Sequence, residues 1–189
     1  MDFKVIFGIL ATILVTIEFL PYVRDIFRKK TQPHIYSWLV WTIIQGVGTL
    51  AMFRGGANFG ALALAIGTLF CIIIFLLAFK YGTKNITKLD TVLLIAALIT
   101  IVIWLIQKDP LWAVILIVII DLTAFIPTYR KTYFEPYTET LISYIFSVLS
   151  NVFGIIAIAH YSFITTFYIS TLVVTNILMV LIIIFRRRK

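Results

Sequence analysis

Charged residues are scarce in this chain of 189 residues, and their scarcity excludes an ordinary water-soluble domain. Only 13% of the residues are charged, while 62% are hydrophobic; a soluble domain is roughly one quarter charged and one half apolar. Acidic residues are especially few, with 8 Asp and Glu against 16 Lys and Arg. The composition therefore indicates a protein that is mostly surrounded by lipid.

Cysteine and histidine are almost absent, which limits the chemistry that the chain supports. With Cys71 as its one cysteine, the chain forms no internal disulfide and no metal site built on thiolates. The two histidines, His34 and His160, fall in loops that we expect on opposite sides of a membrane, too far apart to bind one metal ion. The sequence also lacks paired catalytic acids and a nucleophile beside a base. We therefore expect no enzyme activity, no metal and no cofactor.

Long hydrophobic runs fill the chain between clusters of charged residues. A membrane-spanning helix needs about 20 apolar residues at about 1.5 Å each, and most of the runs are of that length. Only Glu18 and Asp121 interrupt them. We predict an all-α membrane protein with seven transmembrane helices joined by short loops. The runs cover residues 5–23, 34–53, 55–79, 91–107, 110–129, 140–159 and 161–185.

The positions of the basic residues predict the orientation of the helices, because cytoplasmic loops are enriched in Lys and Arg. One set of loops holds most of them, and the other set holds only Lys4, Arg54 and Lys108. With seven spans, we expect the N-terminus outside and the C-terminus in the cytoplasm. The charge asymmetry and the short loops favour a bacterial or archaeal plasma membrane, with a eukaryotic organelle as the alternative. The net charge of +8 is then an orientation signal, and no nucleic-acid partner is expected. The loops expected in the cytoplasm contain Arg24, Arg28, Lys29, Lys30, Lys80, Lys84, Lys88, Arg130, Lys131 and the tail 186–189.

A pattern of prolines, basic residues and hydroxyl residues begins near residue 17 and again near residue 121. The matched positions are Pro21 with Pro127, Arg24 with Arg130, Pro33 with Pro136, Ser37 with Thr140 and Trp41 with Tyr144. The match predicts that helices one to three are repeated as helices five to seven. Because a single spacer helix leaves both units running in the same direction, we predict a 3+1+3 parallel tandem repeat. Residues 1–83 and 109–189 form the three-helix units, and residues 84–108 link them.

The four matched prolines are candidates for the hinges of a gate. Pro21 and Pro127 fall near the cytoplasmic ends of helices one and five, and a proline inside a helix removes one backbone hydrogen bond and weakens the helix there. The alternative is that these two prolines only end their helices before a loop. Pro33 and Pro136 precede the following helices, and proline is well tolerated at a helix start.

The segment PYVRDIFRKKTQPHIYS at residues 21–37 resembles the PQ-loop pattern, in which a proline at a helix end leads through a basic turn to a serine that starts the next helix. The predicted layout is also similar to that of the SWEET sugar transporters and their half-sized SemiSWEET relatives. The resemblance implies a carrier of small solutes; the superfamily also contains carriers of amino acids and vitamins, and the KDEL receptor. The glutamine that follows the proline in this pattern is replaced here by Tyr22 and Thr128.

The same resemblance implies a substrate-facing asparagine on the third helix of each unit. Asn176 matches this position in the second unit. In the first unit Phe70 takes its place, with Thr68 and Cys71 beside it, so the asparagine pair is incomplete. Thr68, Cys71 and Asn176 are therefore candidates for substrate binding.

Two acidic residues lie within the predicted spans. An aspartate at the centre of a membrane helix is unfavourable by about 2.5–3.5 kcal/mol, and such residues usually face a cavity. Asp121 is therefore a candidate for substrate binding and proton coupling, and Glu18 is a second candidate for proton coupling. The alternatives are that Asp121 is a neutral carboxyl bonded to a neighbouring helix and that Glu18 reaches Arg24 or the lipid head groups.

Polar side chains recur on one face of helices two and six. Residues four apart share a helix face, which places Gln45 with Trp41 and Asn151 with Ser147. We expect these four residues to line a substrate-binding cavity between the units, where Trp41 is placed to stack on a flat ligand. Trp38, nearer the inner surface, is expected in the aromatic belt of the membrane interface. The alternative for the polar residues is that they only bond between packed helices.

We therefore predict a transporter or facilitator that moves a small polar solute, such as a sugar, an amino acid or a vitamin-like compound, by alternating access. Proton coupling through Asp121 or Glu18 is a further expectation. The alternative is a non-transporting membrane receptor or assembly partner on the same scaffold, which would hold another protein with its basic loops. The expected partners are the lipid bilayer and the solute, and the sequence leaves open whether the chain forms a homo-oligomer.

Overall fold

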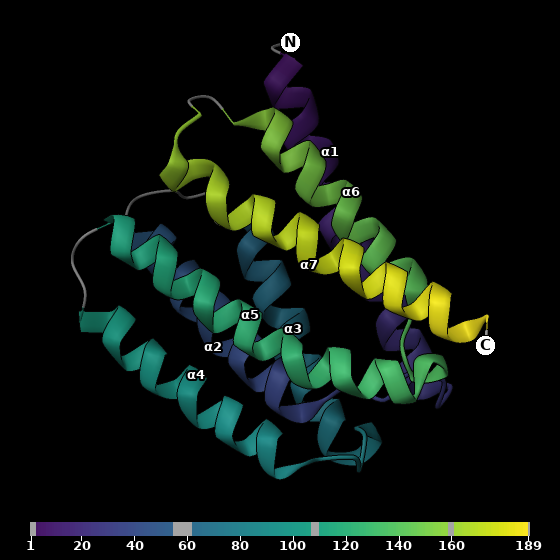
Figure 1. The fold of residues 1–189 in the computed structure, drawn as a ribbon. Coiled ribbons are helices and arrows are strands. Elements are labelled where there is room, and N and C mark those ends of the chain that lie inside the picture. Colours follow the sequence, from purple (N-terminus) through teal and green to yellow (C-terminus); the bar gives the residue numbers. More distant parts are fainter. Residues whose placement is uncertain (1–2, 55–61, 107–109, 159–160, 189) are drawn as a thin grey trace.

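The computed structural model describes residues 3–54, 62–106, 110–158 and 161–188, and this part of the chain contains seven α helices and one short 3₁₀ helix (Figure 1). The helices are α1 (Phe3–Phe27), α2 (Ile35–Arg54), α3 (Leu62–Tyr81), α4 (Lys88–Ile106), α5 (Pro110–Phe134), η2 (Pro136–Thr138), α6 (Leu141–Ala157) and α7 (Phe163–Arg187). The prediction of an all-helical chain with seven helices is confirmed. The predicted start of the third helix, at residues 55–61, lies outside the described residues.

Three helices are long and apolar enough to cross a membrane, namely α1, α4 and the segment Thr165–Arg187 of α7. Shorter apolar helices cover Ile35–Val47, Ala65–Tyr81 and Leu141–Ala157. The outward faces carry many exposed aliphatic side chains, such as Ile13 and Ile103, both 49% exposed. Exposing so large an apolar surface to water is energetically unfavourable, and soluble proteins rarely do so. The chain is therefore an integral membrane protein that lies in the lipid bilayer.

Helices α1 and α5 are longer than the apolar runs that predicted them. Helix α1 continues to Phe27 and α5 to Phe134, so Pro21 and Pro127 both lie inside a helix. The alternative that these prolines end their helices is wrong. Continuing the helix keeps the following backbone groups bonded within the segment, which matters more in lipid than the one hydrogen bond that a proline removes.

The other two prolines lie at the starts of helical segments or just before them. Pro33 precedes α2 by two residues, and Pro136 begins η2 rather than α6. The first turn of a helix tolerates proline because its amide groups have no partner within the helix. The residue immediately before α6 is Thr140.

The turn after α1 is held by its own backbone hydrogen bonds. The amide of Lys30 donates to the carbonyl of Asp25 (2.9 Å), and the amide of Lys29 donates to the carbonyl of Ile26 (2.9 Å). This pair of bonds is a Schellman motif, which needs a left-handed residue just after the helix. Lys29 has that conformation, with φ of 57°, and the chain is thereby turned back toward α2.

Helix α3 packs against both α1 and α2, and helix α7 packs against both α5 and α6. Two further helix pairs connect the first half of the chain to the second: α1 with α6, which is the more extensive contact, and α2 with α5. Figure 1 shows α1 beside α6, and α4 on the outside of the bundle. Helix α4 packs on α5 and α2.

The loops that contain most of the basic residues meet at one end of the bundle. We call this the basic end, comprising residues 24–35, 80–89, 130–141 and 186–188. Its loops are joined by hydrogen bonds, because the Gln32 amide donates to the Thr138 carbonyl (2.9 Å) and the Thr83 amide donates to the Pro33 carbonyl (3.1 Å). The opposite end, where α1 begins and α6 ends, contains Lys4, whose Nζ donates to the Ile158 carbonyl (2.8 Å).

Candidate functional site

A cavity of about 290 Å³ lies within the helix bundle. Its lining comes from α1, α2, α3, α5, α6 and α7, and no described residue of α4 contributes to it. The polar lining residues come from both halves of the chain, and six of the seven helices are therefore needed to build one site. The polar part of the lining is formed by Glu18, Gln45, Cys71, Asp121, Ser143, Ser147, Ser150, Asn151 and Asn176.

Seven of the eight residues predicted to bind substrate line this cavity. These are Trp41, Gln45, Cys71, Asp121, Ser147, Asn151 and Asn176. The eighth, Thr68, lies on the side of α3 that faces α2, where its hydroxyl is 2.8 Å from the hydroxyl of Thr49. Glu18, predicted only for proton coupling, also lines the cavity. The structure thus brings together residues that are separated by more than a hundred positions in the chain.

Asp121 is the most deeply buried acid of the cavity, with 2% of its surface exposed. The indole Nε1 of Trp41 donates to its Oδ1 (3.1 Å), a bond that joins α5 to α2. Its second oxygen, Oδ2, is buried and has no hydrogen-bond partner among the described residues. Buried polar atoms normally have a partner, and this carboxyl therefore has an acceptor position to offer to a bound donor or a proton.

Glu18 lies on α1 and is bonded to α6. The Ser150 hydroxyl donates to its Oε2 (3.3 Å). The alternative that Glu18 reaches Arg24 is wrong, because Arg24 instead pairs with Asp25 (3.0 Å) and Glu18 faces the cavity. The cavity therefore contains a second carboxyl, contributed by another helix.

Three side-chain amides are placed around the same space. Asn151 and Asn176 each donate Nδ2 to a carbonyl of their own helix, at Ser147 (2.7 Å) and Leu172 (2.8 Å) respectively. Gln45 donates Nε2 to the Cys71 sulfur (3.4 Å), from α2 to α3. These bonds hold the amides in place at the cavity wall.

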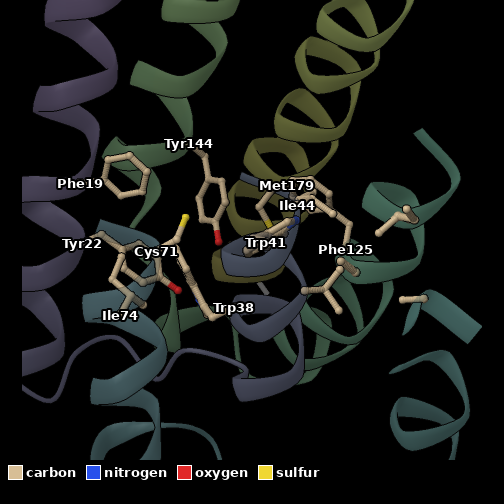
Figure 2. Packing of buried hydrophobic residues seen from close by; sticks show 14 of the residues in the cluster. Phe19, Tyr22, Trp38, Trp41, Ile44, Cys71, Ile74, Phe125, Tyr144 and Met179 are labelled. Carbon is tan, nitrogen blue, oxygen red and sulfur yellow. The ribbon is translucent and has the colours of Figure 1, made fainter. Parts of the chain in front are cut away.

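An aromatic layer lines the cavity on the side toward the basic end. The layer consists of Tyr22, Trp38, Trp41, Phe125 and Tyr144, which gather in the core shown in Figure 2. Ring centroids are 5.1 Å apart for Tyr22 and Trp38, 5.1 Å for Trp38 and Trp41, and 4.9 Å for Trp41 and Phe125. The prediction of Trp38 as a membrane-belt residue is wrong, since it is only 6% exposed and faces the cavity.

A buried ion pair connects this aromatic layer to the loops of the basic end through hydrogen bonds. Lys131, which is fully buried, pairs with Glu139 and also donates to the Gln32 carbonyl (2.6 Å). The Glu139 carboxyl accepts hydrogen bonds from the hydroxyls of Tyr22 (3.3 Å) and Tyr144 (2.9 Å). A buried pair persists when its remaining groups are hydrogen-bonded in this way. The sequence analysis placed Lys131 in a loop expected in the cytoplasm and did not predict this cluster.

Further hydrogen bonds join the two halves of the chain at the basic end. The Ser37 hydroxyl donates to the Ala124 carbonyl (2.6 Å), in the turn that Pro127 disturbs, and accepts from the Thr128 hydroxyl (2.9 Å). The Thr140 hydroxyl is bonded to Thr31 and to Asp25 (3.1 Å). Ser37 and Thr140 were matched positions of the predicted repeat, and both form bonds between the two halves.

A second buried polar cluster lies at the basic end, outside the cavity. His34 lies in a loop as expected, but it is fully buried, and its Nε2 is 3.5 Å from Asp90 Oδ2. Arg130 bonds Asp90 with both Nη2 (2.6 Å) and Nε (3.1 Å). Burial lowers the pKa of His34 to about 4, although the nearby Asp90 carboxyl opposes this shift. The cluster joins α4 to α5 and to the residues before α2.

The described residues contain no group of three or more His, Cys, Asp or Glu side chains that would hold a metal ion. His160 lies outside the described residues. No family model, curated protein or solved structure matches the chain. The resemblance to PQ-loop and SWEET transporters therefore stays a prediction.

Proposed function

We propose that the chain is a membrane transporter or facilitator that moves a small polar solute by alternating access between two three-helix units. Helices α1 to α3 form one unit, α5 to α7 form the other, and α4 links them as a 3+1+3 parallel repeat of seven spans. The contacts support this arrangement, because α3 packs against α1 and α2 as α7 packs against α5 and α6. The basic end faces the cytoplasm, as the distribution of Lys and Arg favours.

The observation that carries the proposal is the cavity that both units build. Parallel repeats in transporters hold their substrate near the middle of the membrane, between the units. Here Glu18, Gln45, Asp121 and Asn151 lie well inside four different helices and line one space. At about 290 Å³, the space is at the small end of the range for ligand sites, which favours a small solute.

The hydrogen bonds at the basic end favour a state that is closed toward the cytoplasm. For solute to leave on that side, the bonds of Thr31 with Thr140 and of Tyr22 with Glu139 have to break. Pro21 and Pro127 lie in the helices that carry the two cavity carboxyls, so bending there would open the end while the cavity itself is kept. Pro33 and Pro136 lie in the connecting segments that move with these helices.

Asp121 is the first candidate for proton coupling and Glu18 the second. Asp121 has an unpartnered oxygen at the cavity, which a proton or a solute donor would occupy in turn. The other titratable side chains that line the cavity are Glu18, Tyr22, Cys71, Tyr144 and Tyr168. We expect Asp121→Asn to abolish the pH dependence of net uptake. Unchanged pH dependence in this variant would count against the role.

The decisive experiment is uptake by proteoliposomes that contain the full chain, tested with a panel of radiolabelled sugars, amino acids and nucleosides. Glu135→Gln is the matched control for loss of a carboxylate, since Glu135 accepts a bond from Asn85 (3.0 Å) at the basic end and does not line the cavity. Failure of the whole panel in both transport and binding would refute the proposal. A stable co-purifying partner, with normal function after Asp121→Asn and Asn176→Ala, would instead favour the receptor alternative.

A further inference from the structure

We infer that the solute accepted by this cavity is a small organic cation with an apolar or aromatic body, held by the carboxyls of Asp121 and Glu18 against the surrounding rings. The inference rests on the proposed function and names its substrate class. Three features carry it: the charge of the lining, the unpartnered oxygen of Asp121 and the number of aromatic side chains.

The charged lining of the cavity has one sign. It contains the carboxyls of Glu18 and Asp121 and no Lys, Arg or His among the described lining residues. Lys131 is a buried cation six residues after Phe125 of the aromatic layer. It does not line the cavity, because it is paired with Glu139 and donates to the Gln32 carbonyl. A buried carboxylate is unfavourable without a counter-charge and hydrogen bonds. The partner that the protein does not supply is therefore a cation.

The geometry of Asp121 shows where that cation would bind. Trp41 occupies Oδ1, while Oδ2 lies buried with no partner among the described residues. A charged N–H donor makes a shorter and stronger hydrogen bond to a carboxylate than a neutral donor does. Glu18 lines the same cavity from α1 and is bonded to Ser150 of α6. The two carboxyls thus reach the solute from different helix pairs.

The rest of the lining suits the body of such a solute. Trp41, Trp38, Phe125 and Tyr144 line the cavity on the side of the basic end. Aromatic faces attract cations, tryptophan most strongly, and they also pack against flat apolar groups. A neutral sugar would stack on the same rings and donate hydroxyl groups to Asp121, but both carboxyls would then have to hold a proton, because a sugar supplies no counter-charge. The combination of two acids and many rings therefore favours an organic cation over a sugar.

Three probes of nearly the same shape test the inference: benzamidinium, benzamide and benzoate, which are cationic, neutral and anionic at neutral pH. Binding of each to the purified full chain in detergent is measured by titration calorimetry. We expect benzamidinium to bind at least tenfold more tightly than benzamide, a difference of about 1.4 kcal/mol, and benzoate to bind most weakly. Asp121→Asn should remove this preference, while Glu135→Gln, which does not line the cavity, should leave the binding of all three probes unchanged.

Each other outcome overturns the inference. If benzamide or benzoate binds as tightly as benzamidinium, the cavity is a ligand site without preference for cations, and the proposed transport function is unaffected. If none of the three binds, the substrate class is wrong, and uptake of the broader panel still decides the proposed function. Glu18→Gln is a second variant in case Asp121→Asn does not fold, with a weakened preference expected. An unaltered preference in both variants would show that the carboxyls do not select the cation.

Discussion

The two helix pairs that join the halves of the molecule differ in how far their contact extends. The α1–α6 pair is bonded from Lys4 and Ile158 at the opposite end to Tyr22 and Glu139 at the basic end. The α2–α5 pair has the smaller contact, and its described side-chain hydrogen bonds lie between the basic end and Asp121. If the proposed function holds, this difference favours the opposite end of the α1–α6 pair as the pivot, and the basic end, where the bonds of the α2–α5 pair lie, as the part that separates.

The two pairs nevertheless share one feature. Each holds a cavity carboxyl by a hydrogen bond across the pair, Glu18 with Ser150 in α1–α6 and Asp121 with Trp41 in α2–α5. In the alignment of the repeats the two acids are not equivalent, since Glu18 matches Ala124. The structure shows that this offset along the helices does not prevent both acids from lining one cavity.

The largest effect is expected from disulfides placed at the two ends of the α1–α6 connection. The hydroxyls of Thr31 and Thr140 are 2.5 Å apart, so Thr31→Cys/Thr140→Cys should form a disulfide, lock the basic end and abolish transport until it is reduced. At the opposite end, a Cβ on Gly8 would lie 3.8 Å from that of Ala157, which is typical of a disulfide. Gly8→Cys/Ala157→Cys should keep transport, because a pivot does not need to open. Proteoliposome uptake with and without reductant measures both.

Either of two results would break the comparison. Loss of transport on oxidation of Gly8→Cys/Ala157→Cys would mean that the opposite end of α1–α6 has to move. Full transport after complete oxidation of Thr31→Cys/Thr140→Cys would mean that the basic end is not a gate. Cys71 is buried and common to both variants, so it does not distinguish them.

The next effect concerns the ion pair at which both helix pairs meet. Lys131→Met leaves Glu139 buried without its cation and should destabilise the protein by about 3–5 kcal/mol. The double variant Lys131→Met/Glu139→Gln removes the stranded charge and should recover much of that loss. Equilibrium unfolding in mixed detergent micelles measures both variants. A double variant as unstable as the single one would show that the pair itself, rather than a stranded charge, accounts for the stability.

A pH effect should be confined to the α2–α5 side, where His34 is buried near Asp90, Arg130 and Lys131. Burial lowers the pKa of His34 from 6.5 to about 4, so between these values the unfolded chain binds a proton that the folded chain does not. Stability present above pH 6.5 is then lost as the pH falls toward 4, by about 2 kcal/mol at pH 5 relative to pH 7. His34→Gln should remove this part of the fall in melting temperature. An equal fall in wild type and variant would rule out His34 as its source.

The smallest effect compares one hydroxyl from each helix pair. Ser37 is fully buried and bonds both the Ala124 carbonyl and Thr128, so Ser37→Ala should cost about 1–2 kcal/mol. Ser150→Ala removes a longer bond to Glu18 (3.3 Å) and should cost about 0.5 kcal/mol. Unfolding in detergent measures the two side by side. If Ser150→Ala lost more stability than Ser37→Ala, the bond from Ser150 to Glu18 would contribute more to stability than the bonds of Ser37 to α5.

Most of the fold was predictable because it follows from local patterns. Uninterrupted apolar runs located the helices, and the four-residue spacing of Trp41 and Gln45 and of Ser147 and Asn151 placed these residues on the faces that line the cavity. The resemblance to known transporters drew attention to Asn176, which is also there. Thr68 was predicted to face the cavity but faces α2. The resemblance gave its position along α3 and did not show which side of the helix it occupies.

The missed residues belong to contacts between distant segments. Trp38 lies near a helix start, a position that also fits a membrane belt, and only its packing between Tyr22 and Trp41 shows that it faces inward. His34 gives no local signal either, since its partner Asp90 is more than fifty residues away. Burial in both cases depends on which helices become neighbours.

Helix formation, membrane insertion and the clustering of basic charge at one end are properties of short stretches, since each depends on the apolar content or charge of about twenty consecutive residues. The pairing of Lys131 with Glu139, the single cavity shared by Glu18 and Asp121, and the unequal contacts of α1–α6 and α2–α5 arise from how the helices pack. Partners separated by many residues meet only after the bundle has formed, and the free energy of a buried charge depends on those partners rather than on its neighbours in the chain.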